Sequence, residues 1–187
     1  YFEIENYAES KKCFDHAIKL VPEDLVSLYG QSQVLFELKE NNTALDITNK
    51  ILKLDPDDTD ALFLKCDILI ETNRAEEVLK IIRNLEHDED TISEIKGLEA
   101  MAHSVLGNNS KALECVNESI KIEPDNEQLW YNKACYLSLL DRKEQANDAL
   151  LIATSIEPEN FNEIKNDKDF ENIKNTERFQ KLFNQLV

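Results

Sequence analysis

The pentapeptide Leu20-Val21-Pro22-Glu23-Asp24 returns three more times along the chain with the same chemical pattern. The later copies are Leu54–Asp58, Ile122–Asn126 and Ile156–Asn160. Pro22 and Pro56 are 34 residues apart, Pro56 and Pro124 are 68 apart, and the last interval is again 34. A fixed period of this length is the signature of a repeat architecture. The spacing therefore predicts an array of similar units, with its least regular junction at Asp90, where the series lacks a proline.

The composition favours helices over strands. The chain has 187 residues, of which 42% are hydrophobic, so it can bury a substantial core. It contains only three glycines and four prolines, whereas a β-rich fold would need many more turn residues. We therefore expect long helices joined by short connections.

Each period contains two amphipathic stretches, which predicts a pair of antiparallel helices per unit. Small residues recur every 34 positions in both stretches, where they would let two helix backbones approach closely. In the second helix of each pair they are Ser10, Ala44, Val78, Ala112 and Ala146; in the first they are Ser32, Cys66, Ala100 and Ala134. The acidic or asparagine residues that follow each proline are predicted to cap the next helix and to lie favourably near its positive end.

When these recurring positions are aligned at the 34-residue period, the chain resembles the tetratricopeptide repeat family, in its prokaryotic type. The residues that carry the resemblance are Trp130, Ala134, Ala146, Ala153 and Pro158 in the last unit, and Tyr7, Phe14, Ala17 and Pro22 in the first. The resemblance implies an all-α fold, a right-handed solenoid of stacked antiparallel helix pairs that forms a superhelix. We predict a single domain over residues 1–187, made of a partial repeat (1–24), four repeats (25–58, 59–92, 93–126 and 127–160) and a helical C-terminal cap (161–187).

Two regions depart from the repeat pattern. In the third full unit Lys96 and Gly97 replace large apolar residues, and a glycine inside a helix costs about 1 kcal/mol relative to alanine. After Pro158 the period ends, but apolar residues continue at Phe161, Ile164, Phe170, Ile173, Phe179, Leu182, Phe183 and Leu186. Asn175-Thr176 is predicted to cap a final helix that seals the open face of the last unit.

Charge and motif content exclude several classes of function. The net charge of −17 disfavours nucleic acid and anionic membranes as partners, and no apolar run approaches the ~18 residues of a membrane span. Four widely separated cysteines are predicted to be buried, reduced thiols of a cytoplasmic protein, and the three histidines lie in different units. We find no metal-binding spacing, phosphate loop or nucleophile motif. The sequence therefore predicts no enzymatic activity, no metal ion and no cofactor.

The resemblance implies protein–protein docking in a concave groove lined by the first helices. The predicted peptide-binding residues are Tyr29, Gln33, Phe36, Phe63, Asp67, Ile70, Met101, Tyr131, Asn132 and Cys135. Aromatic residues at Tyr29, Phe63 and Tyr131 would anchor apolar side chains; the alternative is that they pack between neighbouring helices. The basic and amide residues of the family's chaperone-binding carboxylate clamp are absent. A groove with aromatics plus Asp60, Asp67 and Glu37 would better suit a mixed apolar and basic peptide.

Two other functions remain open. The first unit contains an incomplete helix pair, which would suit self-association into a homo-oligomer. The only methionine is Met101, so the chain is expected to be a fragment or a processed product. It would then be a scaffold segment of a larger protein whose activity lies before Tyr1.

Overall fold

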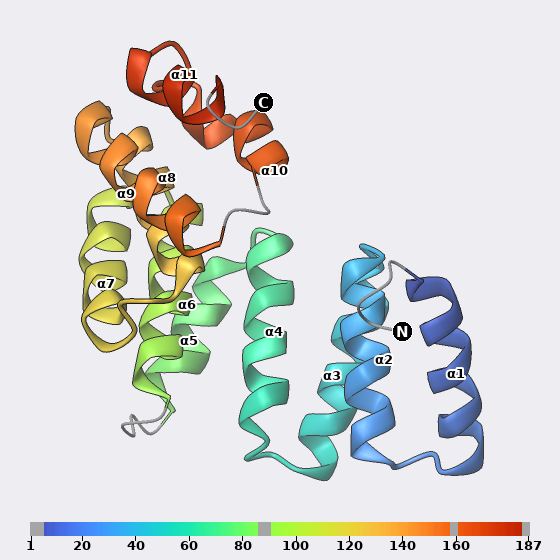
Figure 1. Cartoon of the computed structure of the whole chain (residues 1–187). Helices are drawn as coiled ribbons and strands as arrows, with labels where there is room; N and C mark the ends of the chain where they lie inside the picture. Colours follow the sequence, from blue (N-terminus) through green and yellow to red (C-terminus); the bar gives the residue numbers. More distant parts are fainter. Residues whose placement is uncertain (1–5, 86–90, 158–160, 185–187) are drawn as a thin grey trace. The chain divides into compact units, whose positions relative to one another are not determined.

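The computed structural model describes residues 6–85, 91–157 and 161–184, and within these ranges every regular element is a helix (Figure 1). The helices of the repeats are α1 (Tyr7–Leu20), α2 (Leu25–Glu37), α3 (Asn41–Leu54), α4 (Thr59–Glu71), α5 (Ala75–Arg83), α6 (Ile92–Val105), α7 (Asn109–Ile122), α8 (Glu127–Leu139) and α9 (Lys143–Ile156). They are followed by α10 (Phe161–Asn166), a short 3-10 helix (Lys168–Phe170) and α11 (Glu177–Asn184). Asp90 and Pro158, which the sequence singled out, lie outside the described residues.

The chain divides into two compact units, Tyr1–Glu77 and Val78–Val187, with the boundary inside α5. In the first unit α1 contacts α2, α2 contacts α3 and α3 contacts α4; in the second unit α6 contacts α7, α7 contacts α8 and α8 contacts α9. The predicted all-α fold of consecutive packed helix pairs is therefore confirmed.

The columns of small residues are buried, as predicted. Ser10 is 5% exposed, and the other members of both columns are fully buried. Ser32 is compatible with burial because its hydroxyl donates to the carbonyl of Ala44 at 2.9 Å and lies 2.6 Å from the Thr48 hydroxyl. A buried hydroxyl without such partners would be costly. The small side chains thus bring the paired helices together without an unsatisfied polar group at Ser32.

The predicted helix caps are present at two of the three described junctions. Carboxylate oxygens of Asp24 and Asp58 accept hydrogen bonds from the backbone N–H groups of Ser27 and Ala61, at 3.0 and 2.9 Å. Asn126 precedes α8 but makes no side-chain cap. Its amide donates instead to Glu123 at 2.8 Å, so this part of the prediction is wrong.

The turn inside each helix pair has a feature that the sequence did not reveal. One residue per turn adopts a left-handed conformation, and these residues are spaced 34 positions apart: Lys39 (φ 60°), Asn73 (φ 57°), Gly107 (φ 76°) and Asp141 (φ 57°). The N–H of the following residue donates 2.8 Å back to a carbonyl in the last helical turn, as from Glu40 to Leu35 and from Arg142 to Leu137. This hydrogen-bond pattern terminates a helix while satisfying its end carbonyls.

The C-terminal segment packs on the second unit as a cap. Ile164, Phe170, Ile173, Phe179 and Phe183 belong to the same buried cluster as apolar residues of α7, α8 and α9. The Thr176 hydroxyl accepts from the N–H of Phe179 at 3.3 Å, so the predicted cap of the last helix is confirmed. The predicted apolar residue Leu186 lies outside the described residues, as does the Phe161 side chain.

The cysteine prediction is correct for three residues and wrong for one. Cys66, Cys115 and Cys135 are buried, but Cys13 is exposed because it lies on the open face of α1. All four thiols are free. Among the described residues, no cluster of His, Cys, Asp or Glu is arranged to hold a metal ion, and no described helix is long and apolar enough to cross a membrane.

Candidate functional site

In the first unit, three predicted peptide-binding residues lie on α2. Tyr29, Gln33 and Phe36 are all half-buried. The Tyr29 ring packs against two buried clusters, one containing Leu28 and the other Leu35, and Phe36 packs against the second. The ammonium group of Lys39 lies 5.6 Å from the centre of the Phe36 ring. These side chains are therefore fixed at their base and accessible at their outer edge.

The other three residues of the first unit lie on α4, which contacts α2 directly. Phe63 is buried, with 6% of its surface exposed, whereas Asp67 and Ile70 are half-buried. The structure thus brings together six of the predicted residues on two touching helices.

In the second unit, the predicted residues lie on α6 (Met101) and α8 (Tyr131, Asn132, Cys135). The Tyr131 hydroxyl donates to a carboxylate oxygen of Asp167, and its ring meets Phe170 edge-on with centroids 5.6 Å apart. The Asn132 side-chain oxygen accepts from Gln128 at 3.2 Å, Cys135 is buried and Met101 is half-buried. Tyr131 and Cys135 therefore lie beneath the C-terminal segment.

Burial raises the pKa values of Tyr131 and of the three buried cysteines. The charge of Asp167 adds to the effect of burial on the pKa of Cys135. Burial also raises the pKa of Cys66 to about 12 and that of Cys115 to about 11. A thiol acts as a nucleophile in its deprotonated form, so burial disfavours that role for these three cysteines.

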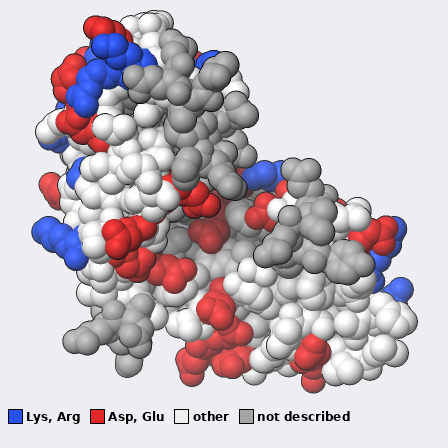
Figure 2. Space-filling view, in the orientation of Figure 1, with Lys and Arg blue, Asp and Glu red and all other residues white. Residues whose placement is uncertain are grey.

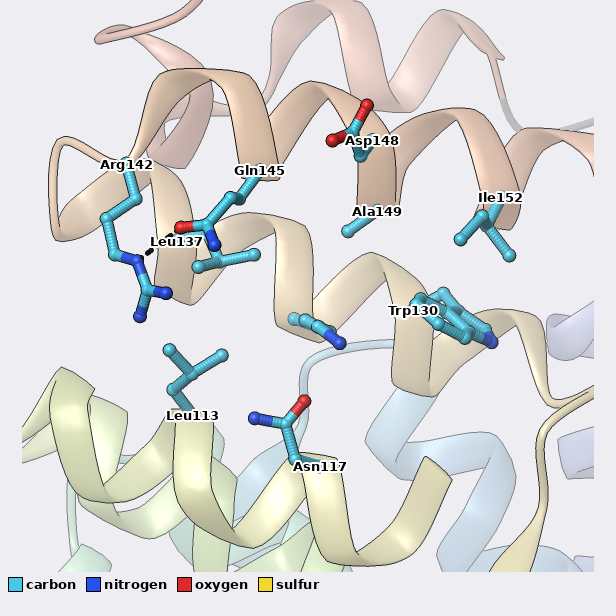
Figure 3. Close-up of a pocket in the computed structure, with 10 residues that line it drawn as sticks. Leu113, Asn117, Trp130, Leu137, Arg142, Gln145, Asp148, Ala149 and Ile152 are labelled. Carbon is cyan, nitrogen blue, oxygen red and sulfur yellow. Dashed lines mark hydrogen bonds between the residues drawn. The ribbon is translucent and has the colours of Figure 1, made fainter. Parts of the chain in front are cut away.

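A pocket that the sequence did not indicate lies in the second unit, between α7, α8 and α9 (Figure 3). Its volume is about 280 Å³. Leu113 and Asn117 border it from α7, and Trp130, Lys133 and Leu137 border it from α8. Arg142, Gln145, Asp148, Ala149 and Ile152 complete the wall from the start and inner face of α9. The spacing of Trp130, Lys133 and Leu137 marks one face of α8, but it cannot reveal which other helices surround that face.

Charged side chains form separate groups on the surface (Figure 2). Figure 2 shows acidic atoms over both units and a mixture of basic and acidic atoms over α9 and α11. In that mixture Arg178 pairs with Glu144 and Asp148, and Lys181 pairs with Glu177. The basic groups of α11 are thus largely neutralised by neighbouring carboxylates.

Comparisons with known proteins extend these observations. Residues 8–154 match the family model described as "Tetratricopeptide repeat". A thermophilic TPR protein of Thermus thermophilus is 16% identical in sequence and superposes with a TM-score of 0.76, with 86% of this chain and 88% of that chain covered. MamA from Desulfovibrio magneticus RS-1 is 15% identical, with a TM-score of 0.65 and coverages of 84% and 89%. YrrB, described as a TPR protein with an unusual peptide-binding site, is 17% identical, with a TM-score of 0.57 and coverages of 85% and 82%. No significant match was found among curated protein sequences.

Proposed function

Because the chain belongs to the tetratricopeptide repeat family, whose stacked helix pairs form extended binding surfaces, we propose that it acts as an interaction scaffold rather than as an enzyme. The partner is a peptide segment or a helix of another protein, and it binds against α2 and α4 of the first unit. The observation that carries this proposal is the partial exposure of five predicted residues on these two touching helices. They are Tyr29, Gln33, Phe36, Asp67 and Ile70.

The chemistry of this surface favours an apolar peptide with basic residues. Tyr29 and Phe36 offer aromatic edges on a rigid base, which is the arrangement of an anchor for apolar side chains. Asp67 lies between Phe63 and Ile70 on α4 and supplies a negative charge. The net charge of −17 also attracts basic segments at long range and speeds their association.

A peptide array tests the proposal. Peptides that alternate phenylalanine with lysine should bind, and peptides in which glutamate replaces lysine should not. The paired change Tyr29→Ala and Phe36→Ala should abolish binding while circular dichroism shows that the helices remain. Leu182→Ala, which truncates a half-buried side chain on α11, is the matched control and should bind like the unaltered chain. Equal binding of the lysine and glutamate peptides, or unchanged binding by the double variant, would contradict the proposal.

Self-association is a second candidate function because apolar residues are exposed around the turn between α1 and α2. Leu20 is 70% exposed, Val21 58% and Val26 78%. Light scattering coupled to size-exclusion chromatography would show a dimer that Val26→Lys dissociates. A monomer at all concentrations would rule this candidate out.

A further inference from the structure

The pocket between α7, α8 and α9 contains two positive charges that lack a negative partner. Among the residues that the structure describes, neither Lys133 nor Arg142 forms an ion pair. The Lys133 ammonium group lies 4.7 Å from the centre of the Trp130 ring, and the Arg142 Nε donates to the Gln145 side-chain oxygen at 2.6 Å. What distinguishes these two cations is that both border the same pocket.

The one carboxylate that lines the pocket is already engaged. Asp148 accepts a hydrogen bond from Arg178 of α11, and in Figure 3 its carboxylate points away from Leu113 and Asn117. Burial, followed by the nearby charge of Arg142, lowers the pKa of Lys133. A bound anion would relieve the repulsion between these two cations.

The rest of the pocket is apolar or carries amides. The Trp130 ring is held in place because its Nε1 donates to the Pro124 carbonyl at 2.7 Å. Leu113 and Ile152 provide aliphatic surface. Figure 3 shows Asn117, on α7, and Arg142, in the turn just before α9, reaching toward the same space. An anionic group with an adjacent apolar group would satisfy both parts of this wall.

We propose that this pocket binds an acidic side chain together with a neighbouring aliphatic side chain from an extended segment of a partner protein. The volume of about 280 Å³ is slightly below the range of roughly 300–1,000 Å³ typical of small-molecule sites. It suits one or two side chains, with the peptide backbone passing outside. The site lies on helices other than α2 and α4 and selects the opposite charge, so it does not depend on the function proposed above.

Trp130 makes the proposal directly testable because it is the only tryptophan in the chain. Its fluorescence and the NMR signal of its indole N–H therefore come from a single ring, which lines this pocket. The full chain would be titrated with an acetylated and amidated tetrapeptide, Gly-Glu-Leu-Glu, and with the uncharged version, Gly-Gln-Leu-Gln. We expect a saturable shift with the first peptide and none with the second.

Substitutions then test whether the charges of Lys133 and Arg142 bind the acidic peptide. Lys133→Gln and Arg142→Gln should each weaken binding by roughly tenfold, which is the order expected for one lost charge-assisted hydrogen bond. Arg142 is exposed, so its replacement leaves the fold unaffected and keeps the test valid even if Lys133→Gln is unstable. Lys133→Arg should retain binding. Lys19→Gln, an exposed change of equal charge on α1, is the matched control and should bind normally.

Four results would overturn the proposal. One is equal binding of the two tetrapeptides, and another is equal weakening by Lys19→Gln. A third is a shift produced by free N-acetyl-leucine but not by the acidic tetrapeptide, which would identify a small-molecule site. The fourth is a concentration-dependent shift without any peptide, which would show that a second copy of the chain occupies the pocket.

Discussion

Replacing Gly97 by alanine should raise the free energy of unfolding by about 0.5–1 kcal/mol. Gly97 lies inside α6 without a positive φ, so the helix gains the full difference in propensity. A Cβ atom at this position would lie 3.8 Å from a methyl group of Leu129, which is an ordinary contact. For a chain of this size, each kcal/mol of added stability raises Tm by about 2–4 °C.

The same substitution should have the opposite effect at Gly30, which also lies inside a helix. There the added Cβ would come within 2.3 Å of the Phe14 ring, so the ring must move. Overpacking of this kind costs about 1–3 kcal/mol, more than the gain in helix propensity. Shortening the neighbour should reverse the sign: in a Phe14→Leu background, Gly30→Ala should no longer destabilise the first unit.

At Gly107, the third and last glycine of the chain, a substitution tests backbone strain without a steric clash. No atom of the described residues lies within 4 Å of a Cβ built there, but φ is +76°. Gly107→Ala should therefore cost about 1 kcal/mol through backbone strain alone. Gly107→Asn should cost less, because asparagine tolerates this conformation and Asn73 adopts it in another turn.

Urea unfolding followed by far-UV circular dichroism measures all three effects, and Trp130 fluorescence reports on the second unit separately. A destabilised Gly97→Ala would refute the assignment of Gly97 as an unstrained helical position. A cost at Gly30 that persists after Phe14→Leu would show that the ring is not the cause.

Two further predictions concern the contact between α8 and the C-terminal segment. Tyr131→Phe should lower the free energy of unfolding by about 1–2 kcal/mol, because it removes the hydrogen bond to Asp167. The control is Tyr136→Phe. The Tyr136 hydroxyl bonds to no described residue, so this substitution should change urea unfolding little. Burial, and then the charge of Asp167, raise the pKa of Asp169, so its ionised form destabilises the folded state. Asp169→Asn should therefore stabilise the chain at neutral pH. This advantage should shrink as the pH falls through the raised pKa of the folded chain, and it should vanish below the ordinary aspartate pKa, where Asp169 is neutral in both the folded and the unfolded chain. An advantage that stays constant from neutral to acidic pH would contradict this explanation.

Much of the fold could be predicted because each repeat imposes the same packing on residues 34 positions apart. Ala44, Ala112 and Ala146 are buried where their spacing placed them, and Thr176 caps α11. The left-handed turn residues could not be predicted from the sequence, because that position requires a backbone conformation rather than one residue type. Lys39, Asn73, Gly107 and Asp141 share φ but no side-chain chemistry.

The repeat length, the paired helices and their buried small residues follow from the order of amino acids, because local periodicity determines which helical face is apolar. The surroundings of an individual side chain do not follow from it. Tyr131 occupies the same repeat position as Tyr29, but only the return of residues 167–170 onto α8 places its ring beneath Phe170. Likewise, Trp130, Asn117 and Arg142 meet around one pocket because three helices converge there. Such contacts are set by tertiary packing, since they join residues whose separation in sequence does not follow the 34-residue period.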